Sequence, residues 1–302
     1  MRHTRAAAPV GTAGVTRQPF RLVSRYRPIA GAALLLVVAL VDAWLLGMMA
    51  TEWTAGWDAY AAYVLDLAQP WAGAEESMTG VGVFRWSPVA AQVLAPFGAL
   101  PWDLYMLGFL GLQLAAIYAM AGPRWPYVVL FPPVLVNLWF MNIDLLVGAA
   151  IVASFRWPGF WAVAFLGKVT PGVGVLWFAF RREWRSFGLA LGTTALVVGC
   201  SFALAPHLWF QWFDALRAMS ALPQSSLGPP LPVRLALAVV VVWHGARTDR
   251  RWLVPVACVL AIPNLWLVTL AGLGAGIALY RQPVRTASRN GVARMARTSR
   301  SR

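Results

Sequence analysis

The chain contains a single lysine, Lys168, and an uncharged apolar stretch precedes it. Inside such a stretch a charged side chain is costly unless it is paired or hydrated, so it indicates a functional site. The alternative is a lysine whose ammonium group reaches the membrane surface. Thr170 and Pro171 follow, and we expect them to open a helix with Thr170 as its cap. A helix start beside a lysine predicts a site for an anion such as phosphate.

A second cation, Arg85, lies in the segment 84–88, Phe-Arg-Trp-Ser-Pro, directly before another apolar stretch. Serine and proline again mark the start of a helix. The alternative is that Arg85 anchors the chain at the interface between membrane and water. Two cations beside two helix starts, if they lie on the same side of a membrane, favour one shared anionic ligand.

Acidic and amide side chains mark two more helix starts. Asp58 opens a predicted helix in the first long loop, where a carboxylate stabilises the helix N-terminus. Asn142 and Asp144 stand together at a later helix start. For both aspartates, capping of the helix is the alternative to a role in chemistry.

The sequence shows no motif for a metal or a nucleotide. His3, His207 and His244 are scattered, and there is no HExxH or CxxC spacing, no P-loop and no GxGxxG. The cysteines, Cys200 and Cys258, both fall inside apolar stretches, so no disulfide framework is predicted. No metal-binding set is therefore visible in the sequence.

The elements that must position these residues are membrane helices. Of 302 residues, 60% are hydrophobic and only 12% are charged, and the mean hydropathy is +0.64. A soluble domain carries roughly twice that share of charge. We predict one transmembrane domain at 29–280 between basic tails at 1–28 and 281–302.

The net charge of +14 is distributed as in a membrane protein rather than a nucleic-acid-binding protein. Arginines gather in the two tails and in short clusters at 181–185 and 247–251. By the positive-inside rule both termini are cytoplasmic, and we expect a multi-pass protein of the plasma (inner) membrane. The tails are expected to contact anionic lipids, and no nucleic-acid partner is expected.

Eight apolar stretches are candidates for membrane spans, each needing about 20 residues. They are 29–50, 103–121, 125–140, 143–155, 158–180, 186–205, 231–246 and 252–280. Pro171 and the pair Pro263-Asn264 predict broken helices in two of them. We expect about ten crossings, with 88–100 as a re-entrant or interfacial helix rather than a further span.

The same orientation makes 51–87 the main extracytoplasmic loop and 206–230 a second one. In the first loop Trp57, Tyr60, Ala61 and Val64 recur at helical spacing, which predicts a short interfacial helix. The chain has 17 tryptophans, and those in the outer loops are ordinary interfacial residues or candidates for stacking on sugar rings.

Four segments resemble, in order, motifs of glycosyltransferase family 87, the polyprenyl-phosphate-mannose-dependent mannosyltransferases with the GT-C membrane fold. Residues 56–60 resemble its outer-loop aspartate motif, and 84–88 are similar to its F-R-Y-[PST]-P. Residues 137–146 resemble its helix break before a leucine-rich run. Finally, 167–171 and 181–185 resemble its K-x-[TY]-P and R-R-x-W-R. Together they cover roughly residues 30–220.

Three positions depart from the family pattern. Trp86 stands in place of a tyrosine, Met141 where a glycine is usual, and Asp144 where an asparagine is common. The resemblance implies an all-α, GT-C-like bundle of about ten transmembrane helices.

The resemblance also implies a mechanism. A sugar, most simply mannose, moves from a polyprenyl-phosphate donor to a glycolipid or glycan acceptor on the extracytoplasmic face, with inversion. Asp58 is the expected general base, and Arg85, Lys168 and Thr170 are expected to bind the donor phosphate. Further contacts with the substrates are expected from four other residues within these motifs. They are Tyr60, Trp86, Asn142 and Asp144. Neither a metal nor a cofactor is implied.

Two alternatives remain open from the sequence. A transporter or flippase for a lipid-linked or anionic solute also uses broken helices and buried cations. However, the charged candidates gather on the outer side and no inverted repeat is visible. The other alternative is a catalytically inactive member of the family. Formation of a glycoside distinguishes the enzyme from both.

Overall fold

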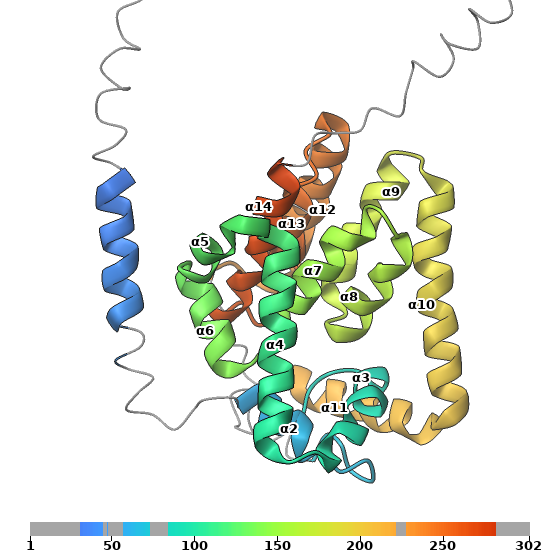
Figure 1. Cartoon of the computed structure of the whole chain (residues 1–302). Coiled ribbons are helices and arrows are strands. Elements are labelled where there is room, and N and C mark those ends of the chain that lie inside the picture. The colour runs from blue at the N-terminus through green and yellow to red at the C-terminus, as the bar shows by residue number, and fades with distance from the viewer. Residues whose placement is uncertain (1–30, 45–46, 48–56, 73–83, 222–227, 282–302) are drawn as a thin grey trace, which may run out of the picture.

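The computed structural model describes residues 31–44, 47, 57–72, 84–221 and 228–281, and the described part is helical without a β-strand (Figure 1). Apart from Arg281, the predicted basic tails at 1–28 and 281–302 lie outside the described residues. The described part of the chain is therefore the predicted membrane domain.

Three helices are long and apolar enough to cross a membrane, counting the described residues only. They are α4 (Trp102–Ala121), α10 (Trp184–Leu204) and α12 (Leu231–Thr248). A fourth crossing is possible by length if α6 (Pro132–Phe140) and α7 (Asp144–Ser154), bent by 115° at their junction, form one broken span. The all-α membrane fold is confirmed, while the count of ten crossings stays a prediction.

The two predicted breaks are confirmed, and both divide a long apolar stretch into short helices. The first stretch forms α8 (Trp161–Gly167), the 3₁₀-helix η4 (Thr170–Val175) and α9 (Leu176–Phe180). The second forms α13 (Leu253–Leu260), η5 (Val268–Leu273) and α14 (Gly274–Arg281). Pro171 and Pro263 stand at these breaks, as expected from the missing amide hydrogen of proline.

The prediction of Thr170 as a helix cap is wrong by one residue. Lys168 has extended backbone (φ −143°, ψ 113°) and ends α8, whereas Val169 is already helical (φ −54°, ψ −44°). Val169 therefore takes the cap position, no side chain caps the turn, and Thr170 is the first residue of η4.

The stretch 125–140, which was predicted as a candidate span, does not form one continuous helix. It forms the one-turn helix α5 (Trp125–Val129) and then α6, because Pro132 and Pro133 cannot continue a helix from α5. A short 3₁₀ turn, η2 (Gly122–Arg124), connects α4 to α5. The stretch 88–100 forms α3 (Pro88–Leu94) and η1 (Ala95–Ala99), which are too short to cross, as predicted.

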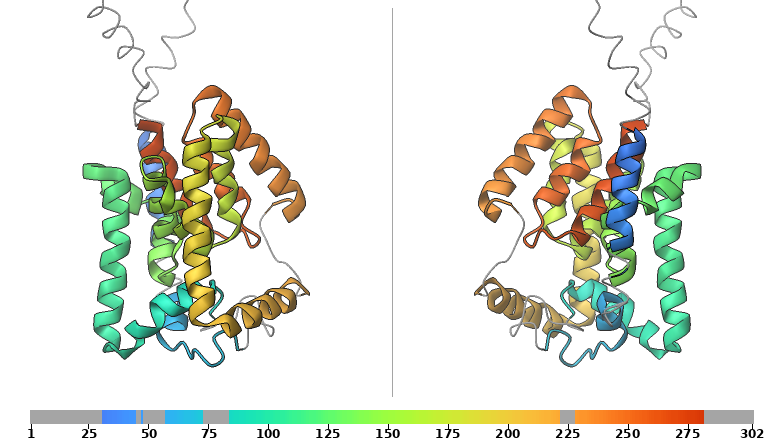
Figure 2. Two further views of the ribbon diagram at one scale, coloured as in Figure 1. Left: turned by 90° about the vertical axis from the view of Figure 1, so that its right-hand side faces the viewer. Right: turned by 90° about the vertical axis from the view of Figure 1, so that its left-hand side faces the viewer.

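Short helices gather at one end of the molecule. There α2 (Trp57–Tyr63), α3 and α11 (Pro206–Ala221) lie together, and Figure 2 shows α11 lying across the end of α10. The turns from α9 to α10 and from α12 to α13, which carry the two arginine clusters, lie at the opposite end (Figure 1). This separation follows the predicted division between an arginine-rich face and an outer face.

The short helix predicted within 51–87 is confirmed, and its contact with the membrane interface stays a prediction. Tyr60 and Val64 are each 46% exposed, whereas Ala59 and Ala62 are fully buried. The other side of the helix packs on the bundle, where the Tyr63 ring lies 4.9 Å from that of Trp102 and its hydroxyl donates to the carbonyl of Leu100 at 3.0 Å. Helix α11 was not predicted from the sequence, although its apolar residues recur at helical spacing.

Candidate active site

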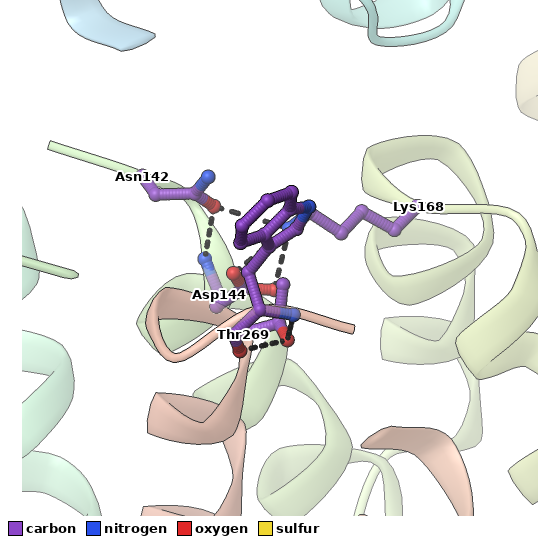
Figure 3. A network of polar contacts seen from close by, with 5 residues as sticks. Asn142, Asp144, Lys168 and Thr269 are labelled. Atoms are coloured by element: carbon purple, nitrogen blue, oxygen red, sulfur yellow. Dashed lines mark hydrogen bonds and ion pairs between the residues drawn. The ribbon is translucent and has the colours of Figure 1, made fainter. Parts of the chain in front are cut away.

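The centre of the site is a buried cluster of Lys168, Asp144 and Asn142 (Figure 3). The lysine Nζ lies 2.7 and 2.8 Å from the two carboxylate oxygens of Asp144, and 3.2 Å from the amide oxygen of Asn142. The Asp144 side chain is 3% exposed and that of Lys168 is 17% exposed. The lysine is thus partly buried and paired with a buried carboxylate.

A strained turn holds the acidic half of this cluster. Helix α6 ends at Met141, whose φ of 54° lies in the left-handed region. The turn brings the amide oxygen of Asn142 within 3.2 Å of the backbone N–H of Asp144, in the first turn of α7. The left-handed backbone gives a physical reason why a glycine is usual at this position, since glycine adopts it without steric cost. Met141 nevertheless stays buried, and its sulfur accepts a hydrogen bond from Gln113.

The basic half depends on the break after α8. Helix η4 approaches α8 closely because Gly172 has no side chain: a Cβ there would lie 1.9 Å from the Phe165 ring. Trp161 and Trp177, both almost fully buried, fill the core on this side. Packing therefore fixes the extended link that carries Lys168 between two short helices.

A cavity of about 10 Å³ adjoins Asp144 on the side of α13 and η5. Its wall includes Thr269, whose hydroxyl is bonded to the backbone of Trp266, together with Cys258 and Pro171. Such a volume holds about one water molecule. It is therefore part of the packed core and not the place of a sugar.

The two predicted cationic segments meet through Ser87. Its hydroxyl donates to the carbonyl of Leu166 at 2.6 Å, two residues before Lys168, and its oxygen also caps α3 by accepting from the N–H of Ala90. Arg85 lies two residues before Ser87 and is partly buried. The bond therefore joins the segment of Arg85 to the segment of Lys168.

Trp86 belongs to the core of this junction. It is 9% exposed, its ring lies 5.3 Å from that of Phe84, and its carbonyl accepts from the indole N–H of Trp71 at 3.1 Å. Its backbone thereby fixes the end of the first outer loop. A contact between Trp86 and a sugar remains a prediction.

The first outer loop contributes α2, with Asp58 in its first turn. The side chain of Asp58 lies outside the part of the chain that the structure describes. Tyr60 is half exposed, and its ring packs edge-on against Trp102 at 5.7 Å. The loop is also tied to α11, because Gln211 donates to the carbonyl of Ala68 at 3.2 Å.

Two features of this end were not predicted. In α11, Trp209 and Trp212 are buried, and the indole of Trp209 donates to the hydroxyl of Ser201 in α10 at 3.1 Å. Arg234 is 1% exposed and donates to four backbone carbonyls. These are the carbonyls of Pro229, Leu260, Ile262 and Pro263. The sequence shows Arg234 only as an arginine near the start of a predicted span. An arginine in that position is equally typical of an anchor at the membrane interface, so its buried role was not predicted.

Among the described residues there is no group of three or more histidine, cysteine, aspartate or glutamate side chains that would hold a metal ion. The central cluster carries one cation and one carboxylate, so its net charge is close to zero. It offers hydrogen-bond donors and acceptors to a polar ligand, while Arg85 adds positive charge on the neighbouring segment.

Comparison with known proteins gives one match. The model of glycosyltransferase family 87 matches residues 84–296, more than two thirds of the chain. The matched region includes Arg85, Asn142, Asp144 and Lys168 and begins after Asp58. No curated protein and no solved structure matches.

Proposed function

Because the chain belongs to glycosyltransferase family 87, a family of membrane glycosyltransferases, we propose that it moves mannose from a polyprenyl-phosphate donor to a glycolipid or glycan acceptor. In this proposal the reaction takes place at the end of the molecule that carries α2, α3 and α11, facing the extracytoplasmic side. The donor chain lies in the membrane, and its phosphate reaches the cationic segments from the lipid.

The observation that carries the proposal is the junction of the two cationic segments. A mannosyl phosphodiester carries one negative charge, and that charge increases as the bond from the sugar to phosphate breaks. Arg85 and Lys168 lie on segments that the bond between Ser87 and Leu166 holds together. Cations held close to a leaving phosphate stabilise the negative charge that develops on it in the transition state.

Proton transfer falls to Asp58 in this proposal. The acceptor hydroxyl attacks the anomeric carbon, the bond from that carbon to the phosphate oxygen breaks, and the proton goes to the Asp58 carboxylate. The leaving group is the polyprenyl monophosphate, and attack opposite to it inverts the anomeric centre. The position of Asp58 on α2, tied to α4 by the contacts of Tyr63, supports a fixed base rather than one on a free loop.

The test is sugar transfer by the purified protein in lipid nanodiscs, with wild type compared with Asp58→Asn. Asparagine keeps the shape and can still cap a helix, but it cannot take the proton. Transfer should fall by roughly 10²–10⁴ while donor binding and stability are kept. Asp66→Asn is the matched control, because Asp66 lies on the same loop and its carboxylate accepts the N–H of Ala68 in a local turn.

Near wild-type turnover in Asp58→Asn would overturn the assignment of the base. Movement of a solute across the membrane without formation of a glycoside would instead support a transporter. If Asp66→Asn abolished transfer while Asp58→Asn did not, the base would be Asp66 and the assignment to Asp58 would be wrong.

A further inference from the structure

In this structure the ammonium group of Lys168 is bonded to two side chains, those of Asp144 and Asn142. An ammonium group has three N–H donors, and three acceptor atoms lie within 3.2 Å of it: both oxygens of Asp144 and the amide oxygen of Asn142. Its charge is also balanced by the Asp144 carboxylate. A phosphate that binds Lys168 must therefore compete with the Asp144 carboxylate for the positive charge of the ammonium group.

Of the two charged partners, the lysine is the one that can move. Asp144 is 2% exposed and sits in the first turn of the 11-residue helix α7, whose N-terminus stabilises a carboxylate. Lys168 has a long flexible side chain on an extended link, and its neighbour Val169 is 52% exposed. A ligand therefore reaches the ion pair from the side of Lys168, whose side chain is 17% exposed, against 3% for Asp144.

We propose that Asp144 is an internal counter-ion that competes with the donor phosphate for Lys168. This inference rests on the proposed function, in which Lys168 binds that phosphate. An anion that reaches Lys168 comes close to the buried Asp144 carboxylate, and the like charges oppose binding. Asp144 therefore weakens the affinity of the site for the lipid phosphate.

The competition gives the carboxylate a role in turnover. Transfer converts a phosphodiester with one charge into a monoester with a charge of about −1.5 to −2 near pH 7. A site with free cations would hold this product more tightly than the donor. When the ion pair between Asp144 and Lys168 forms again, the product phosphate loses a cationic partner and dissociates more readily.

The experiment measures binding of a radiolabelled polyprenyl monophosphate to purified protein in uncharged phosphatidylcholine nanodiscs. Asp144→Asn keeps the hydrogen-bond acceptor and removes the charge, so we expect binding tighter by about tenfold. In a Lys168→Met background no competition for the lysine remains, so the same substitution should tighten binding by clearly less than in wild type. Asp214→Asn is the matched control, since it breaks the exposed pair with Arg217 and should not alter the affinity.

Weaker or unchanged binding in Asp144→Asn would overturn the proposal, because Asp144 would then only hold Lys168 in place or have no influence on the anion. If Asp144→Asn does not fold, Asp144→Ser provides the same loss of charge and the same expected result. Sugar transfer by wild type is measured separately. Tighter binding without any transfer would contradict the proposed function alone, and transfer with unchanged affinity would contradict the counter-ion alone.

Discussion

Replacing Lys168 should lower the stability of the protein, apart from any effect on catalysis, because Lys168 is the counter-ion of the buried Asp144 carboxylate. Lys168→Met leaves the Asp144 carboxylate, only 2% exposed, without its cation. Removing one partner of a buried pair costs about 3–5 kcal/mol. The dipole of α7 stabilises the unpaired carboxylate at its N-terminus and so offsets roughly 0.3–1 kcal/mol of this cost. We therefore expect Lys168→Met to lower the free energy of unfolding by about 3 kcal/mol.

The partner substitution should reverse most of that loss. In Lys168→Met/Asp144→Asn no unpaired charge remains buried, so stability should return close to that of wild type. The coupling energy from the double-mutant cycle should be at least about 2 kcal/mol. Sugar transfer should stay low in the double variant, because the cation proposed to bind phosphate is still absent. The loss of activity can thus be separated from the loss of stability.

Cys258 provides a direct assay for this cycle. It is 2% exposed and lies against η4, where its thiol donates to the carbonyl of Pro171 at 3.1 Å. In a Cys200→Ser background, which removes the exposed cysteine, reaction with a thiol-specific dye during heating reports unfolding near the site. A Lys168→Met variant as stable as wild type, or a coupling energy near zero, would refute the argument that the pair is buried and mutually dependent.

Three further substitutions test the framework of the site. Ser87→Ala should raise the donor KM several-fold and lower stability by about 2 kcal/mol, because the cap of α3 and the bond to Leu166 are lost; unchanged kinetics would contradict this. Met141→Gly relieves about 1–2 kcal/mol of left-handed strain but loses about 2–5 kcal/mol of buried side chain, so thermal unfolding should show net destabilisation. Arg234→Leu should destabilise by about 3 kcal/mol or more, and Arg234→Lys should rescue only part of it; full rescue would show that charge alone suffices.

The sequence was sufficient for features that depend on local chemistry. Low charge and long apolar stretches predicted the membrane class, and Pro171 and Pro263 predicted two broken helices. These features follow from the hydrogen-bonding limits of each residue itself. The same local reasoning identified Lys168 as an unusual charge and Ser87 as part of a helix start.

What the sequence did not predict depends on contacts between distant residues. Lys168 and Asp144 are 24 positions apart, and only the folding of α7 against α8 brings them into a pair. The side of α2 that packs on the bundle was not predicted, because it depends on where Tyr63 meets Trp102. Helix α11 was missed although its buried residues Leu208, Trp212, Ala215 and Met219 recur at helical spacing, because the stretch carries too many polar residues for a span and was interpreted only as a loop.

The most direct test of the account is the choice of donor by the purified wild-type protein. Polyprenyl-phosphate mannose and a nucleotide-linked mannose are offered separately with a membrane glycolipid acceptor, each in the presence of a metal chelator. We expect a mannosylated product, with inverted anomeric configuration, from the polyprenyl-phosphate donor alone and at an undiminished rate. Product formed only from the nucleotide donor, or no product from either donor, would contradict the account.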